Sequence, residues 1–483
     1  MNSCFVRPVV CSVALMFVAS TAAHGQLVTP KTVPIHQDDQ FSIFPSLRAG
    51  MGGVSIALDD TLADPFVNPA KATRVRTPTL FALPYVHTIS AGFGGGHTLP
   101  VGGIGSFGDW SGAAEFAVQT ISHGGGTSIS DRSAGNQYAT ASIARRLPNG
   151  VSVGGSAYVA GLNAVDGVPL LYAGSDRIVQ SGTLSDFRVG MTKAWGERQF
   201  EFLVVNNRTA MTQDVHYTTR TFPPGGGAGI TAERQDHNLD HTVIWGAHTQ
   251  YMQPVGGDGW RVGWLATANY LSHPKIPNYQ LQSIPRDPGT TYGYNIGVGA
   301  ARVVRGTSFG IDVIDEPMFS NTWGAAGVDT TGTTGIVIRA GDRTVSNKFN
   351  FSNATVRMGV GHQVTMAKDS SSAFGFQLGL IAHSINYRLR QTNHVQGTSR
   401  VQDEGWTEWT PTLGFRWRTR DFEMVYTYRR TCGPSACIDI MSGDKVNLVS
   451  PSPGGIIAAP SSPLSIDGGT AHLHRIMMTV PIR

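Results

Sequence analysis

Two short motifs in the sequence have the spacing of catalytic or nucleotide-binding loops. Residues 306–310 fit G-x-S-x-G, the nucleophile elbow of serine hydrolases, and residues 103–108 fit G-x-G-x-x-G, a phosphate-binding turn. In proteins that use these motifs, each loop connects a strand to the start of a helix. Residues 306–310 instead lie at a predicted hairpin turn, and no helix pattern follows residues 103–108. A barrel lipase is the alternative, and it would need a serine, a histidine and an acid that converge in the fold. We predict that the chain is not an enzyme and uses no cofactor.

His472 and His474 are two residues apart, so their side chains would share one face of a strand and could ligate a metal ion together. The pair supplies only two ligands, and histidines in strands are more often neutral residues than ligands. The sequence therefore predicts no metal site.

The chain has four cysteines, of which Cys4 and Cys11 fall in a predicted export signal. Cys432 and Cys437 bracket Gly-Pro-Ser-Ala in a predicted surface loop. In an exported protein a disulfide between these two is the expected state. A metal site is the alternative, and it lacks two further ligands.

Residues 1–25 have the order of a secretory signal peptide. Arg7 supplies the positive charge, residues 9–19 are apolar, and residues 23–25 place small side chains at the cleavage positions before Gln26. A membrane anchor is the alternative, but the apolar run is too short for one. We expect an exported chain in which residues 26–45 form a polar periplasmic leader.

The composition is typical of an extended β architecture. Charged residues make up 14% of the chain, against about 25% in ordinary soluble proteins, and there are 59 glycines. After the N-terminus, no stretch provides the roughly 20 apolar residues of a spanning helix. The net charge of +4 is too small to predict a nucleic-acid partner. Moderate hydrophobicity spread over alternating strands is typical of a transmembrane β-barrel.

Alternation of apolar and polar residues supports this interpretation. In residues 259–273, Trp260, Trp264 and Tyr270 fall on one face, and Arg261 falls on the other. Residues 407–418 alternate in the same way, as do residues 421–431. A soluble β-sandwich or propeller is the alternative. The length of the strands, the aromatic residues near their ends and the lack of a repeat period favour the barrel.

Short and long connections alternate between the predicted strands, as they do in bacterial outer-membrane barrels with short periplasmic turns. Fourteen strands are predicted, and residues 79–108 would raise the count to sixteen if they add a hairpin. The segments are 112–121, 138–146, 151–162, 184–196, 198–206, 240–253, 259–273, 292–305, 307–315, 351–366, 372–389, 407–418, 421–431 and 470–482.

Residues 46–73 precede the strands and have a different character. Gly50, Gly52 and Gly53 permit tight turns, and the proline steps at Asp64-Pro65 and Asn68-Pro69 favour extended backbone at Asp64 and Asn68. The segment carries too many apolar residues for a solvated linker. We predict that it needs a cavity to occupy.

This stretch resembles the N-terminal plug of FadL-type outer-membrane transporters and of their PorV-type relatives. The resemblance rests on Arg48–Gly53, the pair Asp59-Asp60, and Asn68-Pro69-Ala70, with Lys71 closer to the PorV-type form. It implies a barrel from residue 78 to residue 483 with residues 46–77 as a plug in its lumen, and it favours fourteen strands.

The resemblance implies two alternative functions. A FadL-like channel would take up hydrophobic molecules such as long-chain fatty acids through the outer membrane, gated by the plug. A PorV-like component would instead bind a partner protein of a secretion or surface-attachment system. If the chain is a channel, the residues around Asn68-Pro69-Ala70 would border the bound ligand. The alternative is that these residues only fix the plug to the barrel wall. The predicted ligand-binding residues are Met51, Phe66, Val67, Asn68, Pro69 and Ala70.

Overall fold

The computed structural model describes residues 42–89, 94–123, 132–166, 177–221, 230–273, 289–326, 329–332, 335–366, 369–432 and 470–482. The predicted signal peptide, nearly all of the predicted leader and Cys437 lie outside these parts.

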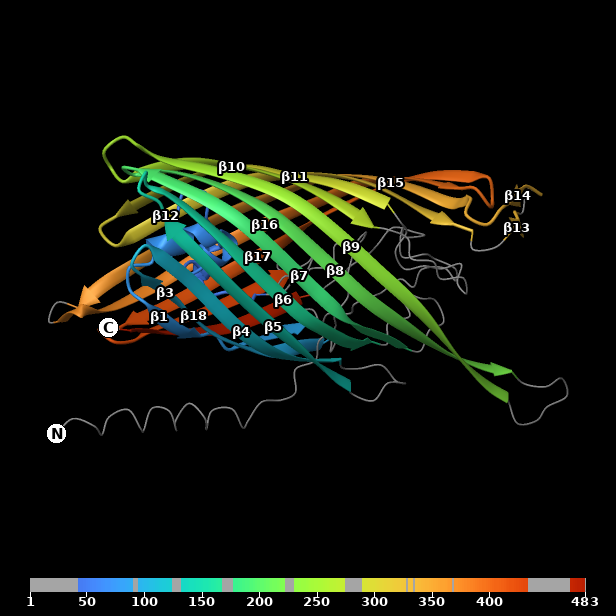
Figure 1. The fold of residues 1–483 in the computed structure, drawn as a ribbon, viewed down its shortest axis with the longest axis horizontal. Helices are drawn as coiled ribbons and strands as arrows, with labels where there is room; N and C mark the ends of the chain where they lie inside the picture. Colours follow the sequence, from blue (N-terminus) through green and yellow to red (C-terminus); the bar gives the residue numbers. More distant parts are fainter. Residues whose placement is uncertain are drawn as a thin grey trace, which may run out of the picture.

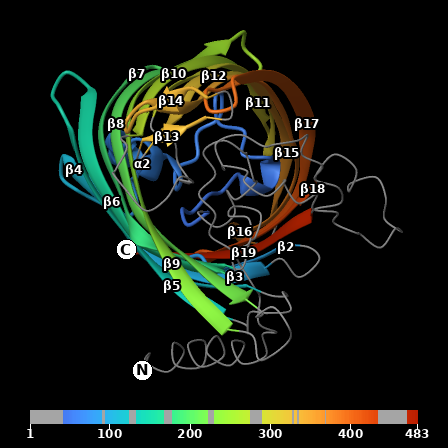
Figure 2. The same cartoon turned by 90° about the vertical axis from the view of Figure 1, so that its right-hand side faces the viewer.

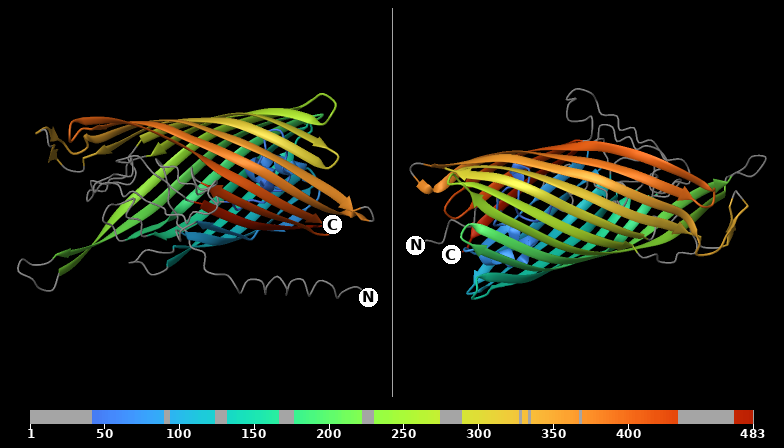
Figure 3. Two further views of the ribbon diagram at one scale, coloured as in Figure 1. Left: turned by 180° about the vertical axis from the view of Figure 1, so that it is seen from behind. Right: turned by 90° about the horizontal axis from the view of Figure 1, so that it is seen from above.

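The wall is one antiparallel sheet that closes into a barrel of obliquely running strands (Figure 1, Figure 3). Strands adjacent in the sequence pair with each other around the ring, and β19 pairs back onto β1 and β2. The strands are β1 (Thr79–Ala82), β2 (Tyr85–Ile89), β3 (Gly94–Phe107), β4 (Trp110–His123), β5 (Arg132–Arg146), β6 (Val151–Asp166), β7 (Arg177–Trp195), β8 (Arg198–Thr221), β9 (Ile230–Val255), β10 (Trp260–His273), β11 (Gly289–Val304), β12 (Thr307–Ala325), β15 (Arg343–Met366), β16 (Asp369–Asn393), β17 (Thr398–Arg418), β18 (Glu423–Cys432) and β19 (Thr470–Pro481).

The barrel has sixteen wall positions, because β1 and β2 occupy one of them. Both pair with β3 on one side and with β19 on the other, and only Leu83 and Pro84 separate them. The preference for fourteen strands was therefore wrong, and the alternative of sixteen is the count observed. The glycine-rich hairpin of residues 79–108 supplies the two further positions. Two short strands, β13 (Thr330–Thr331) and β14 (Val337–Ile338), form a separate ladder.

The predicted alternation of faces is confirmed. On β10 the side chains of Trp260, Trp264 and Tyr270 are 36–43% exposed on the outer face, and Trp409 and Trp417 on β17 are 42% and 45% exposed. A closed sheet leaves no unpaired backbone edge, and a belt of exposed aromatic and aliphatic side chains needs an apolar solvent. The chain is an outer-membrane β-barrel. Among the described residues, none of the helices has the length and hydrophobicity needed to cross a membrane.

Two of the motifs considered for catalysis or metal binding lie in a turn and a strand of the wall. The G-x-S-x-G motif begins in the β11–β12 turn, where Gly306 has φ of 81°. The Nδ1 atoms of His472 and His474 lie 2.9 Å from the hydroxyls of Tyr428 and Tyr426 on the neighbouring strand. No cluster that could hold a metal ion is found in the described part of the chain.

Cys432 is the last residue of β18 and is fully buried. Its sulfur is in a disulfide. Since no other cysteine lies in the described residues, the pairing with Cys437 stays a prediction.

Candidate functional site

Residues 42–78, here termed the internal segment, run across the inside of the ring of strands before the chain enters β1 (Figure 2). The segment contains three short helices, η2 (Ala49–Met51), α2 (Asp64–Val67) and η3 (Pro69–Arg74). Its hydrogen bonds reach strands that are far apart in the sheet, among them β7 and β8 on one side and β16 and β17 on another.

Asp60 organises the local fold of the internal segment. Its carboxylate accepts five hydrogen bonds, at 2.7–3.2 Å. Four come from backbone amides, those of Leu47, Arg48, Leu62 and Ala63, and one comes from the Ser46 hydroxyl. One side chain therefore joins both limbs of the loop, residues 46–48 and residues 62–63.

The turns follow from the glycines and prolines, with one correction. Gly52 ends η2 with φ of 69°, a left-handed conformation that glycine adopts without strain. The Asn68 backbone is extended as predicted, and its side chain accepts a hydrogen bond from the Ala70 amide at 3.2 Å. The expectation of extended backbone at Asp64 was wrong. Asp64 begins α2, because proline fits the first turn of a helix, where no intrahelical N–H partner is needed.

Two inward-facing side chains of the wall bind the backbone of residues 50–56. The Thr412 hydroxyl of β17 donates to the Gly50 carbonyl at 2.9 Å and accepts from the Gly52 amide at 3.0 Å. On β12, Asp312 accepts from the amides of Ser55 and Ile56 at 2.8 and 3.3 Å. These contacts hold the segment by its main chain.

Glycines of the wall provide the space for this close approach. A Cβ atom at Gly359 would lie 2.2 Å from the Met51 carbonyl oxygen, and one at Gly379 would lie 2.2 Å from the Gly52 nitrogen. Backbone contacts this short require something to move. A Cβ atom at Gly154 or Gly263 would also meet the backbone of the segment, at 2.8 and 2.7 Å. At Gly190, Gly299 and Gly310 it would instead meet side chains at 2.0–2.6 Å. The glycine content of the strands thus forms a shaped seat for the internal segment.

The other end of the segment is held by buried charges. Lys71 Nζ lies 3.0 Å from Glu201 Oε1 on β8 and 3.6 Å from Asp64 Oδ1. Asn68 Nδ2 donates to the second oxygen of Glu201 at 3.0 Å. On β7, Arg188 donates to the carbonyl oxygens of residues 66 and 67, both at 3.1 Å, and so caps the end of α2. Lys71, the residue closer to the PorV-type form, thus pairs with carboxylates inside the barrel.

Burial and the neighbouring charges shift the pKa of Asp64 in opposite directions, and the same is true of Lys71. Burial raises the pKa of Asp64 to about 6, and the neighbouring Lys71 ammonium only partly offsets that rise. For Lys71, burial disfavours the charged form, but attraction by Asp64 and Glu201 outweighs it and raises the pKa of the ammonium.

We expect docking of the internal segment to weaken as the pH rises through the range set by Asp64. Its pKa is about 6 in the docked state against 3.8 for a free carboxyl, so the docked state binds the proton more tightly. The stabilisation of the docked state by the proton on Asp64 is fully present below about pH 4 and is lost above about pH 6. Hydrogen exchange of the amides of residues 64–74 in the folded barrel should show it. Asp64→Asn should flatten the profile, whereas protection that increases with pH would contradict it.

The six predicted ligand-binding residues differ in their surroundings. Asn68, Pro69 and Ala70 are buried against β6, β7 and β8, which is the arrangement of a lock to the wall. Met51 is buried beside a cavity, and Val67 is 46% exposed. Phe66 is 6% exposed and packs in an aromatic stack. All six lie in the internal segment, and only Val67 has an exposed side chain, so their role in ligand binding stays a prediction.

The aromatic stack contains a residue that the sequence interpretation assigned to the leader. Phe44 stacks on Phe66 with ring centroids 5.0 Å apart, and Phe81 meets Phe66 edge-on at 5.9 Å. Phe44 also meets Tyr158 of β6 at 6.2 Å. The neighbouring Ile43 is 2% exposed. An apolar pair just before Pro45 was the available signal for a packed segment that begins earlier than residue 46.

These aromatic side chains join two apolar clusters on the inner face of the wall. Phe44 packs against both. The first cluster consists of Ile43, Tyr85, Ala117, Ile121, Tyr138, Ala160, Leu162, Met211 and Leu473. The second consists of Leu62, Phe66, Phe81, Leu83, Ile104, Ala113, Val425 and Met477.

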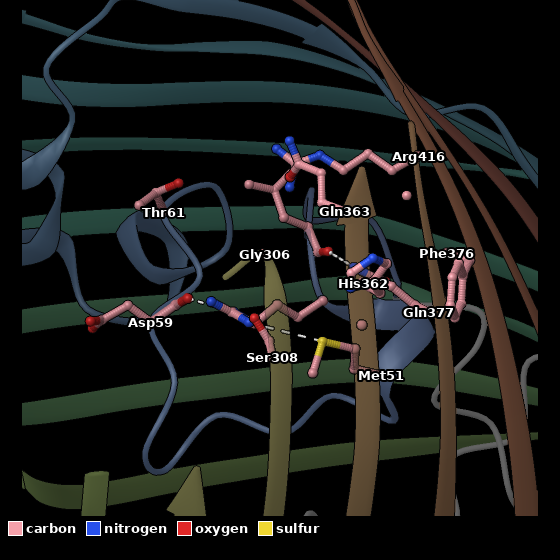
Figure 4. A pocket seen from close by; sticks show the side chains of 14 residues that line it. Met51, Asp59, Thr61, Gly306, Ser308, His362, Gln363, Phe376, Gln377 and Arg416 are labelled. Carbon is pink, nitrogen blue, oxygen red and sulfur yellow. Dashed lines mark hydrogen bonds between the residues drawn. The ribbon is translucent and has the colours of Figure 1, made fainter. Parts of the chain in front are cut away.

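A cavity of about 170 Å³ lies between the internal segment and the short-turn end of the barrel (Figure 4). Met51 and Asp59 of the segment line it, together with Gly306 of the β11–β12 turn and Arg416 near the end of β17. More than half of the residues that line it are polar or charged, in contrast to the two apolar clusters.

Comparison with known proteins gives structural matches only. No protein-family model and no curated protein matches the sequence. A FadL homologue of Pseudomonas aeruginosa matches with a TM-score of 0.43 and 11% identity, over 90% of this chain and 97% of that one. The toluene transporter TbuX of Ralstonia pickettii matches with a TM-score of 0.40 and 11% identity, over 92% and 100%. CdiB of Acinetobacter baumannii matches with a TM-score of 0.39 and 8% identity, over 83% and 60%. Function therefore has to be argued from this chain's own interior.

Proposed function

We propose that the chain is an outer-membrane channel for the uptake of hydrophobic small molecules, gated by the internal segment. The observation that carries the proposal is the apolar inner wall formed by the two clusters around Phe44 and Phe66. The interior of an outer-membrane barrel is ordinarily polar, because it faces water. A large apolar surface inside such a barrel suits a solute that has to leave water.

The internal segment has the properties of a gate. It fills the position between the apolar clusters and the polar cavity beside Met51, so a molecule that crosses the barrel has to pass it. Its polar contacts to the wall include single hydrogen bonds, such as those of Thr412 and Asp312, each with a net value of about 1 kcal/mol. The aromatic stack of Phe44 on Phe66 covers the apolar wall in this state. A hydrophobic solute could replace those rings with contacts of the same chemistry.

The resemblance of residues 48–70 to FadL-type plugs supports the same function, and two of the matched structures are a FadL homologue and a toluene transporter. Solutes would leave through the cavity beside Met51, whose polar lining faces the periplasmic turns. Nothing in the described interior favours the secretion-system alternative.

A cysteine pair at positions 68 and 190 tests the gate. A Cβ atom at Gly190 would lie 2.9 Å from Cγ of Asn68. The sulfur of a cysteine at position 68 would take the place of that Cγ, and the distance is close to that between a Cβ atom and the partner sulfur in a disulfide. Asn68→Cys/Gly190→Cys should therefore lock the segment to β7. We expect cells with the oxidised pair to lose uptake of a radiolabelled alkylbenzene and of a radiolabelled fatty acid. Reductant should restore uptake to the level of the single variants.

The two single-cysteine variants control for the loss of Asn68 and for the added side chain at position 190. Heat-modifiable mobility on gels and surface labelling check that the barrel is folded and exported. Uptake that is unchanged by the oxidised lock would refute gating by this segment. Normal uptake combined with loss of surface display of exported proteins would favour the secretion-system alternative.

A further inference from the structure

Glu115 is a buried carboxyl group on the inner face of the wall. It lies in the middle of β4 and is 4% exposed, whereas its neighbour Phe116 is 47% exposed on the outer face. Its backbone pairs with Gly102 on β3 and with Thr140 on β5. The side chain therefore points into the barrel.

Neither carboxyl oxygen of Glu115 has a hydrogen-bond partner among the described residues. Other buried acids of the interior are engaged. Asp312 accepts from two amides of the internal segment, Glu201 binds Lys71 and Asn68, and Asp186 binds Arg188. A buried carboxyl without any partner is destabilising, so its presence calls for an explanation beyond packing.

The neighbours of Glu115 on the inner face of β4 are apolar and belong to the clusters of the proposed path, and the Tyr158 side chain lies near enough to interact with its charge. On the same face of β4, Ala113 belongs to the cluster of Phe66 and Ala117 belongs to the cluster of Ile43. Glu115 stands between these two alanines along β4, and Phe44 packs against both clusters. The Phe81 ring lies against Gly102, directly opposite Glu115 in the ladder.

We propose that Glu115 receives the polar end of the transported molecule, and that this end donates hydrogen bonds, as an alkylammonium group does. The hydrophobic part of the molecule would take the place of the Phe44 and Phe66 rings. An ammonium supplies the missing donors and a positive charge that favours the ionised form of Glu115, whereas a carboxylate ligand brings only acceptors. This inference rests on the proposed uptake function and names its substrate class as hydrophobic amines in preference to fatty acids.

Equilibrium dialysis of the purified full chain in nanodiscs of zwitterionic lipid tests the assignment, with empty nanodiscs as the blank. The probes are radiolabelled octylamine, octanol, octanoate and octylbenzene. We expect octylamine to bind about tenfold or more tightly than octanoate, the factor expected for one charge-assisted hydrogen bond. Octanol should fall between them. Glu115→Gln should bring octylamine and octanoate to within about twofold of each other.

Glu197→Gln is the matched control. It makes the same chemical change in the exposed β7–β8 turn and should leave the preference for octylamine intact. If Glu115→Gln fails to fold, as judged by heat-modifiable mobility, the unaltered protein serves as the test. Tighter binding of octylamine than of octanoate would support the proposal, and equal binding would overturn it.

The possible outcomes separate this inference from the uptake function. Binding of octylbenzene without any preference for octylamine would overturn the role of Glu115 and leave the channel function standing. A preference for octylamine that survives in Glu115→Gln would also overturn it. Failure of the protein to bind any of the four probes would refute both.

Discussion

Gly359→Ala should displace the internal segment from its seat and open the barrel. The new Cβ atom would lie 2.2 Å from the Met51 carbonyl oxygen and 2.6 Å from the Met51 carbonyl carbon. Both are backbone atoms, so rotation of a side chain cannot relieve the clash. The β15 ladder makes its hydrogen bonds through the main chain and should persist. A barrel of sixteen strands whose lumen is cleared resembles a water-filled porin. Ion conductance in planar bilayers should therefore rise by about an order of magnitude or more.

Gly361→Ala is the matched control for this prediction. Gly361 lies two residues along the same inward face of β15, but its nearest neighbour is the Met51 sulfur at 3.1 Å, the end of a flexible side chain. Conductance of that variant should stay near that of the unaltered protein. Equal conductance of the two variants would show that the wall glycines do not position the segment. Proteolysis of the segment in the folded barrel gives a second measurement.

Lys71→Met should strongly destabilise docking of residues 64–74. Lys71 lies 3.0 Å from Glu201 and 3.6 Å from Asp64, and its side chain is 9% exposed. Removal of the ammonium leaves two buried carboxyl groups close together without a compensating charge, a change that costs about 3–5 kcal/mol. Hydrogen exchange of the amides of residues 64–74 should accelerate accordingly, while amides of the wall strands stay protected.

A double variant separates charge from packing. Lys71→Met/Glu201→Gln leaves one carboxyl fewer in the site, so it should recover part of the lost protection. Lys348→Met, at an exposed position of β15, should change nothing. If Lys71→Met alone lowers the docking free energy of residues 64–74 by less than about 1 kcal/mol, the ion pair is screened by water and does not hold the segment.

The strand pattern could be predicted from the sequence because it depends on residue type and spacing alone. Trp260 and Arg261 alternate between lipid and lumen, and the β11–β12 turn is set by Arg305-Gly306. The count of fourteen was wrong for a physical reason. The first wall strand is interrupted by Leu83-Pro84, and β3 is so rich in glycine that side-chain alternation is weak there.

The internal segment was recognisable for a similar reason. Its turns depend on neighbours in the chain, such as Gly52 at the end of η2 and Asn68 at the start of η3. Its true beginning was less evident, because Ile43 and Phe44 stand in a polar stretch and their burial depends on clusters built from distant strands.

A barrel with a compact apolar segment before its first strand can be inferred from residue order, because alternation, turn residues and proline steps act locally. How the segment is held and what it covers depend instead on contacts between distant parts of the chain. The hydrogen bond between Gly52 and Thr412 joins residues 360 positions apart, and the hydrogen bond between Asn68 and Glu201 joins residues 133 positions apart. Glu115 looks like any polar residue of an alternating strand. Its isolation arises because β4 places it between two apolar clusters that the segment forms with β1–β6, β8, β18 and β19, and such an environment exists only once the barrel has closed.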